Sequence, residues 1–157
     1  GCGTGYFSGM FGKKDYVGID VDGPAIAYAR KRHTGYTFLQ YEKRCPFPDC
    51  TFDNILINAV FHHIPDRMMG HVLADVLRVA KPEAKVLVMD TVPVTDQRSW
   101  WGRFLFSRDQ GRDAKGVAKM TRMLKTRFSI RHRAVSRTGP YVLQIYHLTP
   151  KNGHGHR

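Results

Sequence analysis

The sequence predicts an α/β protein with a doubly wound, Rossmann-like sheet that is mostly parallel and has an antiparallel strand at one edge. A glycine-rich turn, residues 1–5, precedes the acidic residue Asp20 by roughly the 20 positions that separate these features in nucleotide-binding sheets. Apolar strand patterns then alternate with helical patterns as far as residue 90, which is typical of parallel sheets. Two strand patterns around Gly139-Pro140 close the chain and suit an antiparallel edge.

Local patterns predict the individual elements. Pro24 follows Asp22-Gly23 and marks the first turn of a helix. Residues 53–59 form an apolar run that is typical of a strand covered on both faces. Residues 67–80 place apolar side chains on one side of a helix, which Lys81-Pro82 ends. The predicted strands are residues 16–20, 36–41, 53–59, 85–90, 129–135 and 141–148, and the predicted helices are residues 6–11, 24–31, 67–80 and 117–128, with a long connection over residues 92–112.

The composition indicates one compact domain over residues 1–157, because a chain of 157 residues with 42% hydrophobic content can form a core. No stretch approaches the roughly 18 continuous apolar residues of a membrane span. Cys2, Cys45 and Cys50 are an odd number of cysteines, and their spacing does not suit a metal site. We therefore expect reduced thiols, a cytoplasmic protein and no bound metal.

The positive charge is concentrated in one segment. The chain has a formal net charge of +12, yet residues 1–97 hold 11 Lys and Arg against 11 Asp and Glu. Residues 98–137 hold 12 Lys and Arg against two Asp, a net charge of +10. This clustering indicates an acidic partner, such as a phosphorylated substrate, an anionic membrane surface or RNA, unless the charges only form a solvated helix face.

The glycine turn reads Gly1-Cys2-Gly3-Thr4-Gly5, and the bulky Tyr6 follows it. A dinucleotide site needs G-x-G-x-x-G, in which the third glycine allows close packing of helix and strand, so the pattern disfavours NAD or FAD. A carboxylate at Asp20, where the next predicted strand ends, can accept two hydrogen bonds from ribose hydroxyls.

Two further segments carry a resemblance to a known family. Residues 45–66, CPFPDCTFDNILINAVFHHIPD, are similar to the pattern LPFPDxSFDxVxxxxxLHHxPD. Residues 77–90, LRVAKPEAKVLVMD, are similar to LxRVLKPGGxLLIxD. Together with the glycine turn, these motifs make residues 1–90 resemble the class I S-adenosylmethionine-dependent methyltransferases with a type 11-like domain. The resemblance implies their Rossmann-like fold, S-adenosyl-L-methionine as the cofactor, and methyl transfer as the reaction.

The resemblance also implies a hydrophobic first strand before the glycine turn, in the middle of the sheet. Nothing precedes Gly1 in this sequence, and no initiating Met is present. Without that strand, its two neighbours in the sheet would have long unpaired edges. We therefore expect that upstream residues are missing here, in preference to a strand supplied by a partner chain.

The cofactor site that the resemblance implies lies along one rim of the sheet. The glycine turn would cradle the methionine portion, Asp20 would hold the ribose, and the end of the strand at residues 53–59 would border the sulfonium. The adenine neighbour stays open between Tyr41 and Glu42, and Glu42 is otherwise an ordinary surface carboxylate. The expected cofactor-binding residues are Gly1, Cys2, Gly3, Thr4, Gly5, Asp20, Val21, Tyr41, Glu42 and Asn58.

His62 is the candidate catalytic residue. Positioning of the nucleophile supplies much of the acceleration in methyl transfer, so a base is needed only if the accepting atom carries a proton that must leave. His62 and His63 follow the strand at residues 53–59, and imidazole titrates near neutral pH. Adjacent side chains cannot both point the same way, so we expect one of the pair to pack structurally.

Residues 92–128 are expected to form a lid or a substrate-side insertion. Trp100, Trp101, Phe104 and Leu105 would form an apolar helical stripe beside arginines, which suits a lid or an interfacial helix. A helix packed over the end of the sheet is the alternative.

The sequence favours S-adenosylmethionine-dependent methyl transfer to a small-molecule or lipid-like acceptor. An RNA methyltransferase is the first alternative, and it rests on charge alone, since Asn58-Ala59-Val60-Phe61 stands where amino-methylating enzymes have N/D-P-P-Y/F/W. The second alternative is a non-catalytic methyltransferase-like subunit, because Glu83-Ala84 replaces the usual Gly-Gly.

Overall fold

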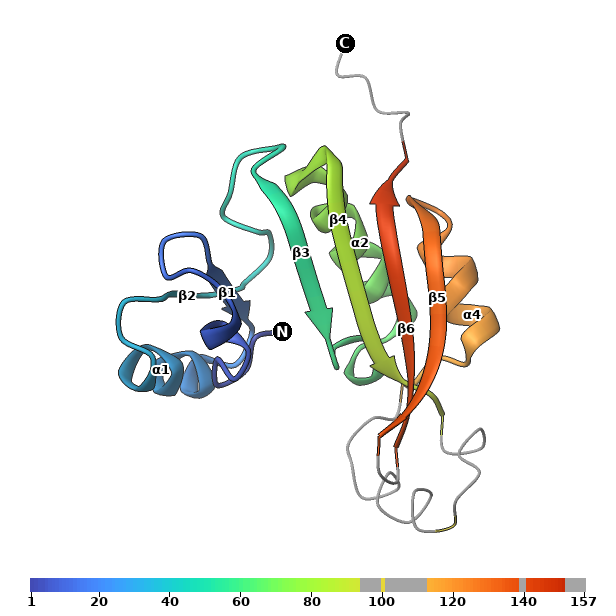
Figure 1. Cartoon of the computed structure of the whole chain (residues 1–157), viewed down its shortest axis with the longest axis horizontal. Helices are drawn as coiled ribbons and strands as arrows, with labels where there is room; N and C mark the ends of the chain where they lie inside the picture. The colour runs from blue at the N-terminus through green and yellow to red at the C-terminus, as the bar shows by residue number, and fades with distance from the viewer. Residues whose placement is uncertain (94–99, 101–112, 139–140, 152–157) are drawn as a thin grey trace. The chain divides into compact units, whose positions relative to one another are not determined.

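The computed structural model describes residues 1–93, 100, 113–138 and 141–151. The chain divides into two compact units, Gly1–Pro46 and Phe47–Arg157, which are described separately (Figure 1). The expectation of a single domain over residues 1–157 stays a prediction.

The first unit contains a two-stranded parallel sheet and one α-helix. Strands β1 (Val17–Asp20) and β2 (Thr37–Gln40) pair in parallel along their whole length. Helix α1 (Gly23–Arg32) connects them and begins where the Asp22 carboxylate accepts a hydrogen bond from the Ala25 backbone N at 3.1 Å. Its buried side chains, Ile26 and Ala29, pack against Phe38 of β2.

The predicted helix over residues 6–11 was wrong in type and length. Only a 3-10 helix, η1 (Ser8–Met10), forms there. Gly9 and Gly12 lie in and just after this segment, and glycine disfavours a longer helix because of its backbone entropy.

The second unit contains a four-stranded sheet of mixed direction. Its strands are β3 (Phe52–Asn58), β4 (Ala80–Thr91), β5 (Phe128–Thr138) and β6 (Tyr141–Pro150), in the order β3-β4-β6-β5. Strand β4 pairs in parallel with β3, whereas β6 pairs antiparallel with both β4 and β5. The predicted antiparallel pair around Gly139-Pro140 is therefore confirmed, but the strand that runs antiparallel to the others, β6, lies between β4 and β5 and not at the predicted edge.

Helices α2 (Asp66–Val79) and α4 (Val117–Leu124) lie on the same face of this sheet (Figure 1). Their apolar side chains pack on the strand residues that point to this face, and each large side chain buried in this way contributes about 1.5–3 kcal/mol. The buried core consists of Ile57, Phe61, Met69, Leu73, Val86, Val88, Met120, Leu124, Phe128, Tyr146 and Leu148. None of the described helices is long and apolar enough to cross a membrane.

The ends of both helices of the second unit differ from the prediction. Helix α2 ends at Val79 and β4 starts at once with Ala80, so Lys81-Pro82 lies in a strand instead of a turn. Helix α4 ends at Leu124, four residues early, because Phe128 begins β5 and is fully buried there.

The predicted lid falls mostly outside the described residues, which omit 94–99 and 101–112. Within the rest of the 92–128 segment, Met120 and Leu124 belong to the core under the sheet. The exposed Trp100 is the one described residue of the aromatic stripe.

Candidate functional site

The glycine loop, residues 1–5, lies against β1. The Cys2 backbone N donates a hydrogen bond to the Ile19 carbonyl at 2.9 Å. Gly3 and Gly5 have φ angles of 51° and 80°, which L side chains rarely adopt. A Cβ on Gly5 would come within 2.8 Å of the Phe38 ring, whereas a Cβ on Gly3 would meet nothing within 4 Å. Glycine therefore permits close packing at position 5 and leaves open space at position 3.

Asp20, the last residue of β1, holds this loop with its carboxylate. Its Oδ2 accepts a hydrogen bond from the Gly3 backbone N at 2.7 Å, and its Oδ1 accepts one from the Asp22 backbone N at 3.0 Å. The side chain is 14% exposed, and each carboxylate oxygen can accept a second hydrogen bond. Val21 follows and is exposed. The carboxylate is thus oriented by two backbone groups.

Tyr41 and Glu42 follow β2 on the same side of the first unit. The Tyr41 backbone N donates a hydrogen bond to the Asp20 carbonyl at 2.7 Å, so the two strand ends are joined. The Tyr41 side chain is half-buried, and its hydroxyl lies 3.5 Å from the Lys43 carbonyl, whereas Glu42 is exposed. The structure brings Tyr41 beside Asp20, and Glu42 follows it in the sequence, so the choice between the two candidates for the adenine neighbour stays open.

The remaining loop positions differ in exposure. Gly1 and Thr4 are exposed, and Cys2 is half-buried with its Sγ 3.7 Å from the Gly3 carbonyl. Burial raises the pKa of the Cys2 thiol to about 11. Cys2 is therefore a neutral thiol at physiological pH and not a nucleophile.

Asn58 ends β3 in the second unit, and an unusual backbone conformation follows it. Asn58 lies opposite Met89 of β4, and the Ala59 backbone N donates a hydrogen bond to the Met89 carbonyl at 2.9 Å. Ala59 has a φ of 55°, a left-handed conformation that costs a residue with a Cβ about 1–2 kcal/mol. Such strain is concentrated at functional sites, which makes the turn after β3 a candidate.

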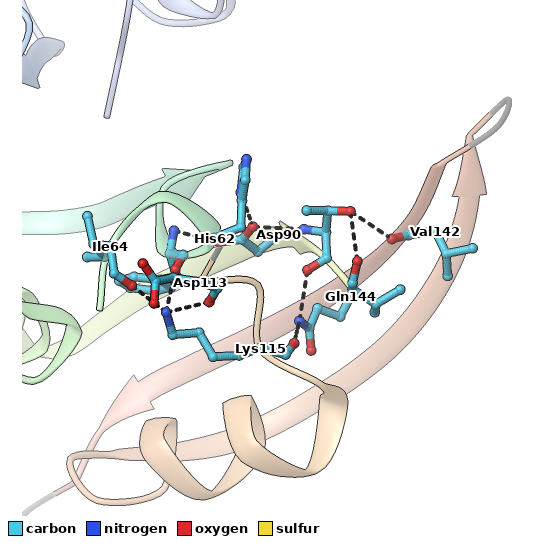
Figure 2. Close-up of polar contacts among 10 residues, drawn as sticks. His62, Ile64, Asp90, Asp113, Lys115, Val142 and Gln144 are labelled. Carbon is cyan, nitrogen blue, oxygen red and sulfur yellow. Dashed lines mark hydrogen bonds and ion pairs between the residues drawn. The ribbon is translucent and has the colours of Figure 1, made fainter. Parts of the chain in front are cut away.

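His62 lies in this turn, in the 3-10 helix η2 (Phe61–His63), and contacts the end of β4 (Figure 2). Its Nδ1 lies 2.6 Å from Asp90 Oδ1, and the two side chains are only 5% and 1% exposed. Asp90 Oδ2 accepts a hydrogen bond from the Phe61 backbone N at 2.6 Å, and Oδ1 accepts one from the Thr91 backbone N at 2.8 Å. Three hydrogen-bonding nitrogens thus converge on one buried carboxylate.

His63 differs from its neighbour. Its side chain is exposed, and its ring lies against the His62 ring with 3.8 Å between the centroids. One of the two adjacent histidines is packed structurally, as expected, and it is His62; the expectation that the two side chains point in different directions is wrong, because their rings lie against each other.

A buried lysine holds the turn that carries His62. Lys115 is 2% exposed, and its Nζ donates hydrogen bonds to the carbonyls of Phe61 at 2.7 Å, Asp113 at 2.6 Å and Ile64 (Figure 2). The Asp113 backbone N donates in turn to the His62 carbonyl at 3.2 Å. The backbone of the His62 turn is therefore tied on several sides to the segment that precedes α4.

Burial lowers the pKa of the Lys115 ammonium, and the carboxylates of Asp113 and Asp66 oppose this shift. Asp66, the first residue of α2, has its Oδ1 3.8 Å from Lys115 Nζ. The three carbonyl oxygens compensate the ammonium for the hydration that burial removes.

Strand β6 completes the polar network. Gln144 Nε2 donates hydrogen bonds to the carbonyls of Lys115 at 2.7 Å and Thr91 at 3.2 Å. The Tyr146 hydroxyl lies 3.0 Å from Gln144 Oε1 and 3.2 Å from the Val117 carbonyl. Every polar group of these two side chains has a partner, so the network is rigid.

The sequence reasoning missed Asp90 and Lys115. Asp90 ends a predicted buried strand, and an acidic residue at the end of an apolar run was a usable signal for a site at the strand's carboxyl end. Lys115 stands among many basic residues, and nothing in its sequence context marks it as buried. Asn58 and His62 lie in the second unit, so their proximity to Asp20 stays a prediction. Within the described residues, no group of three or more His, Cys, Asp or Glu could hold a metal ion.

Comparisons with known proteins identify the family. Residues 1–88 match the family model described as a methyltransferase domain. The chain is 34% identical over 107 residues to the fatty-acid O-methyltransferase of Mycolicibacterium smegmatis, which covers 64% of this chain and 38% of that protein. It is 28% identical over 103 residues to phthiotriol/phenolphthiotriol dimycocerosates methyltransferase 1 of Mycobacterium ulcerans, covering 64% of this chain and 37% of that protein. The match thus spans less than two fifths of either relative.

A solved structure supports the fold. The crystal structure of a SAM-dependent methyltransferase from Aquifex aeolicus has a TM-score of 0.73 and 22% sequence identity, and the match covers 95% of this chain and 79% of that chain. The predicted fold class is therefore confirmed. Because the family model matches more than half of its length, the chain belongs to the methyltransferase-domain family and has the Rossmann-like fold of the class I S-adenosylmethionine-dependent methyltransferases.

Proposed function

We propose that this methyltransferase domain transfers the methyl group of S-adenosylmethionine to an oxygen atom of a lipid-like small molecule. The observation that carries the proposal is the 34% identity to an enzyme named fatty-acid O-methyltransferase. The second curated relative is also named for a long lipid.

The residues of the first unit fit the cofactor. Asp20 has a carboxylate that is held in place by two backbone groups, and carboxylates of this kind bind ribose hydroxyls well. The open space beside Gly3 leaves room for a ligand to approach the loop backbone. Exposed Val21 and half-buried Tyr41 offer apolar surface near Asp20 for an adenine ring. The sulfonium of the bound cofactor supplies an electrophilic methyl group, and the protein's task is to align the acceptor with it.

His62 is proposed as the group that meets the acceptor in the second unit. It follows the strained residue Ala59 and is fixed by Asp90 on one side and by the Lys115-bound turn on the other. A histidine held in this way acts as a general base or as a hydrogen-bond acceptor.

The test is a methyl-transfer assay with S-adenosylmethionine labelled in its methyl group. The purified protein is offered long-chain fatty acids, long-chain alcohols and total RNA in separate reactions, and label is measured in the organic extract and in precipitated RNA. We expect label in the organic extract, and little of it with Asp20→Ala. Label confined to RNA would contradict the proposal, and no transfer at all would favour a non-catalytic subunit.

An RNA methyltransferase remains the second candidate, because exposed basic residues gather on α4, on the residue that follows it and on β5. They are Lys119, Arg122, Lys125, Arg131, Arg133 and Arg137. Lys115 does not count toward this surface charge, since it is buried.

A further inference from the structure

Two histidines from neighbouring strands lie opposite each other on the four-stranded sheet. His132 of β5 pairs with His147 of β6 in the antiparallel register. Side chains of directly opposed residues lie on the same face of a sheet, within contact distance of each other. The two rings are 5.6 Å apart between their centroids, and their planes make an angle of 75°. Both residues are exposed, so solvent reaches the pair.

The pair lies on the face of the sheet that α2 and α4 do not cover. Tyr146 and Leu148, the neighbours of His147 along β6, are buried in the core beneath these helices (Figure 1). Successive side chains of a strand point to opposite faces, so the His147 ring points away from that core. The two imidazoles are therefore not part of the packing that holds the second unit together.

An irregularity in β5 produces the alignment of the two rings. Ile130 pairs with Leu148, but the next paired residue along β5 is His132. Arg131 is thus an extra residue in this strand, and with a regular register it would lie opposite His147 in place of His132. Bulges of this kind re-aim side chains and are over-represented next to functional sites. The two imidazoles lie together because of this local feature.

We propose that His132 and His147 together bind one Zn²⁺ ion, or a divalent cation of the same class such as Cu²⁺ or Ni²⁺, through one nitrogen of each ring. The Zn–N distance in proteins is about 2.0–2.1 Å, so two nitrogens on one ion lie at most about 4.2 Å apart. A nitrogen that faces the other ring lies closer to it than its own centroid does. The 5.6 Å between the centroids therefore permits a shared ion after rotation about side-chain bonds alone.

The available ligands select the class of cation. Imidazole suits zinc, copper and nickel, whereas calcium and magnesium prefer oxygen ligands. The adjacent positions on this face carry apolar side chains, since Leu87 of β4 lies opposite His147 and Ala134 follows two residues after His132. In the described part of the chain, no third His, Cys, Asp or Glu completes a metal cluster. The pair thus supplies two ligands and leaves the other positions to water, so binding is weaker than in a closed zinc site with four protein ligands.

The nearest described charge on this face is positive. Arg131 Nε donates a hydrogen bond to Thr149 Oγ1 at 3.0 Å, and Thr149 lies two residues from His147, on the same face. The guanidinium repels a cation, but it is exposed, so water and salt screen the repulsion. The alternative to a metal site is an edge-to-face contact of two aromatic rings, which such an angle also suits. Only the metal site predicts that both rings respond to Zn²⁺.

The first test uses the unmodified full chain and ZnCl2 alone. The histidine ring signals are recorded by NMR during a titration, with His132→Gln and His147→Gln used to assign them. We expect the two rings to shift along one common binding curve, while His71, which is exposed on α2, does not follow it. A shift of only one ring, or of neither, would overturn the inference.

The second test asks whether the two rings act as one site. Calorimetry with ZnCl2 compares His132→Gln, His147→Gln, the double variant and the matched control His71→Gln. The thiols, together with His154 and His156 outside the described residues, are present in all of these proteins, so any ions that they bind do not affect the comparison. We expect each single variant to bind Zn²⁺ at this site at least tenfold more weakly, and the double variant to lose no more than either single one, because a chelate needs both nitrogens.

Two outcomes of the calorimetry would contradict a shared site. Losses that add up in the double variant would mean two independent histidines, and binding unchanged in all variants would place the ion elsewhere on the chain. The melting temperature without zinc shows whether each variant folds. If a variant does not fold, the NMR titration of the unmodified chain still decides. Neither test uses S-adenosylmethionine, so its result is independent of the proposed methyl transfer.

Discussion

The two units hold their candidate residues in different ways. In the first unit, the Asp20 carboxylate is held by backbone groups of Gly3 and Asp22, both within 17 positions of it in the sequence. In the second unit, His62 is held by Asp90, 28 positions away, and by Lys115 through a neighbouring carbonyl. The first arrangement is local and partly exposed, whereas the second is assembled from distant segments and is buried. Changes in the first unit should therefore affect ligand binding, and changes in the second should affect catalysis and stability together.

The largest effect is expected for Gly3→Val. The fold has room for the new Cβ, since nothing lies within 4 Å of it, and the φ of 51° costs about 1–2 kcal/mol for a residue with a side chain. The side chain would fill the space that the cofactor needs, so we expect no detectable binding of S-adenosylmethionine by calorimetry. Gly9→Val is the matched control, because its Cβ also meets nothing within 4 Å and its φ is not positive. Retained binding in Gly3→Val would show that the loop only begins a turn.

A smaller loss of binding is expected for Asp20→Ala. The carboxylate would no longer accept hydrogen bonds from the ribose, and charge-assisted hydrogen bonds contribute about 1.5–3 kcal/mol, so Kd should rise roughly 10- to 150-fold. The melting temperature serves as the control, since the Gly3 and Asp22 backbone groups also lose their acceptor. A folded variant with unchanged Kd would refute the role of Asp20.

The contrast between the units also explains what the sequence could predict. The glycine turn, the place of Asp20 at the end of a strand and the existence of the strands depend on local patterns, and they were predicted correctly as structural features. The partnership of His62 with Asp90 depends on which parallel strands pair and in what register, which local patterns do not encode. The burial of Lys115 could not be predicted for a further reason. The cost of burying its ammonium is offset by backbone carbonyl groups, and since every residue has one, the sequence does not mark these partners. The ends of α2 and α4 were misjudged because core packing of Ala80 and Phe128 overrides helix propensity.

In the second unit, Lys115→Met is expected to lower the free energy of unfolding by about 2 kcal/mol. Three carbonyl groups lose their hydrogen-bond donor, and each buried unsatisfied group costs about 1–3 kcal/mol. Removal of a buried charge offsets part of this cost. Lys119→Met is the matched control. Its Nζ lies 2.6 Å from Asp66 Oδ2 but is 47% exposed, and surface pairs contribute about 0–1 kcal/mol. Denaturant unfolding of both variants measures the difference, and equal losses would mean that the burial of Lys115 has no energetic consequence.

The Lys115→Met variant should also change how the stability of the fold depends on pH in the alkaline range. Burial lowers the pKa of Lys115 in the folded state, so between that pKa and the ordinary value of 10.5 the unfolded chain binds more protons. This group therefore makes stability rise with pH in that window. Cys2 and Tyr16, whose pKa values burial raises to about 11 and about 12, act in the opposite direction in both proteins. We expect the stability difference between unmodified protein and Lys115→Met to widen as pH increases from 8 to 10, and a constant difference would contradict the shift.

The smallest effect on methyl transfer is expected for the exposed arginines of β5. They take no part in the hydrogen bonds that hold Asp20 or His62. Arg131, Arg133 and Arg137 are exposed on β5, at the edge of the four-stranded sheet. Charged side chains on an edge strand prevent pairing with another chain, which is sufficient reason for basic residues there. Replacing all three by Ala should leave lipid methylation within twofold at low and moderate salt, while light scattering detects increased self-association. The matched control replaces the exposed Lys14, Lys31 and Arg32 of the first unit by Ala.

The contradicting outcome is that the β5 arginines bind RNA phosphates. In that case the β5 variant, and not the control, should show a weaker dependence of RNA affinity on salt. The slope of log K against log salt concentration should fall by about 0.7–0.9 for each phosphate that the arginines no longer neutralise. That result, together with methylated RNA, would reverse the ranking of lipid over RNA as the acceptor.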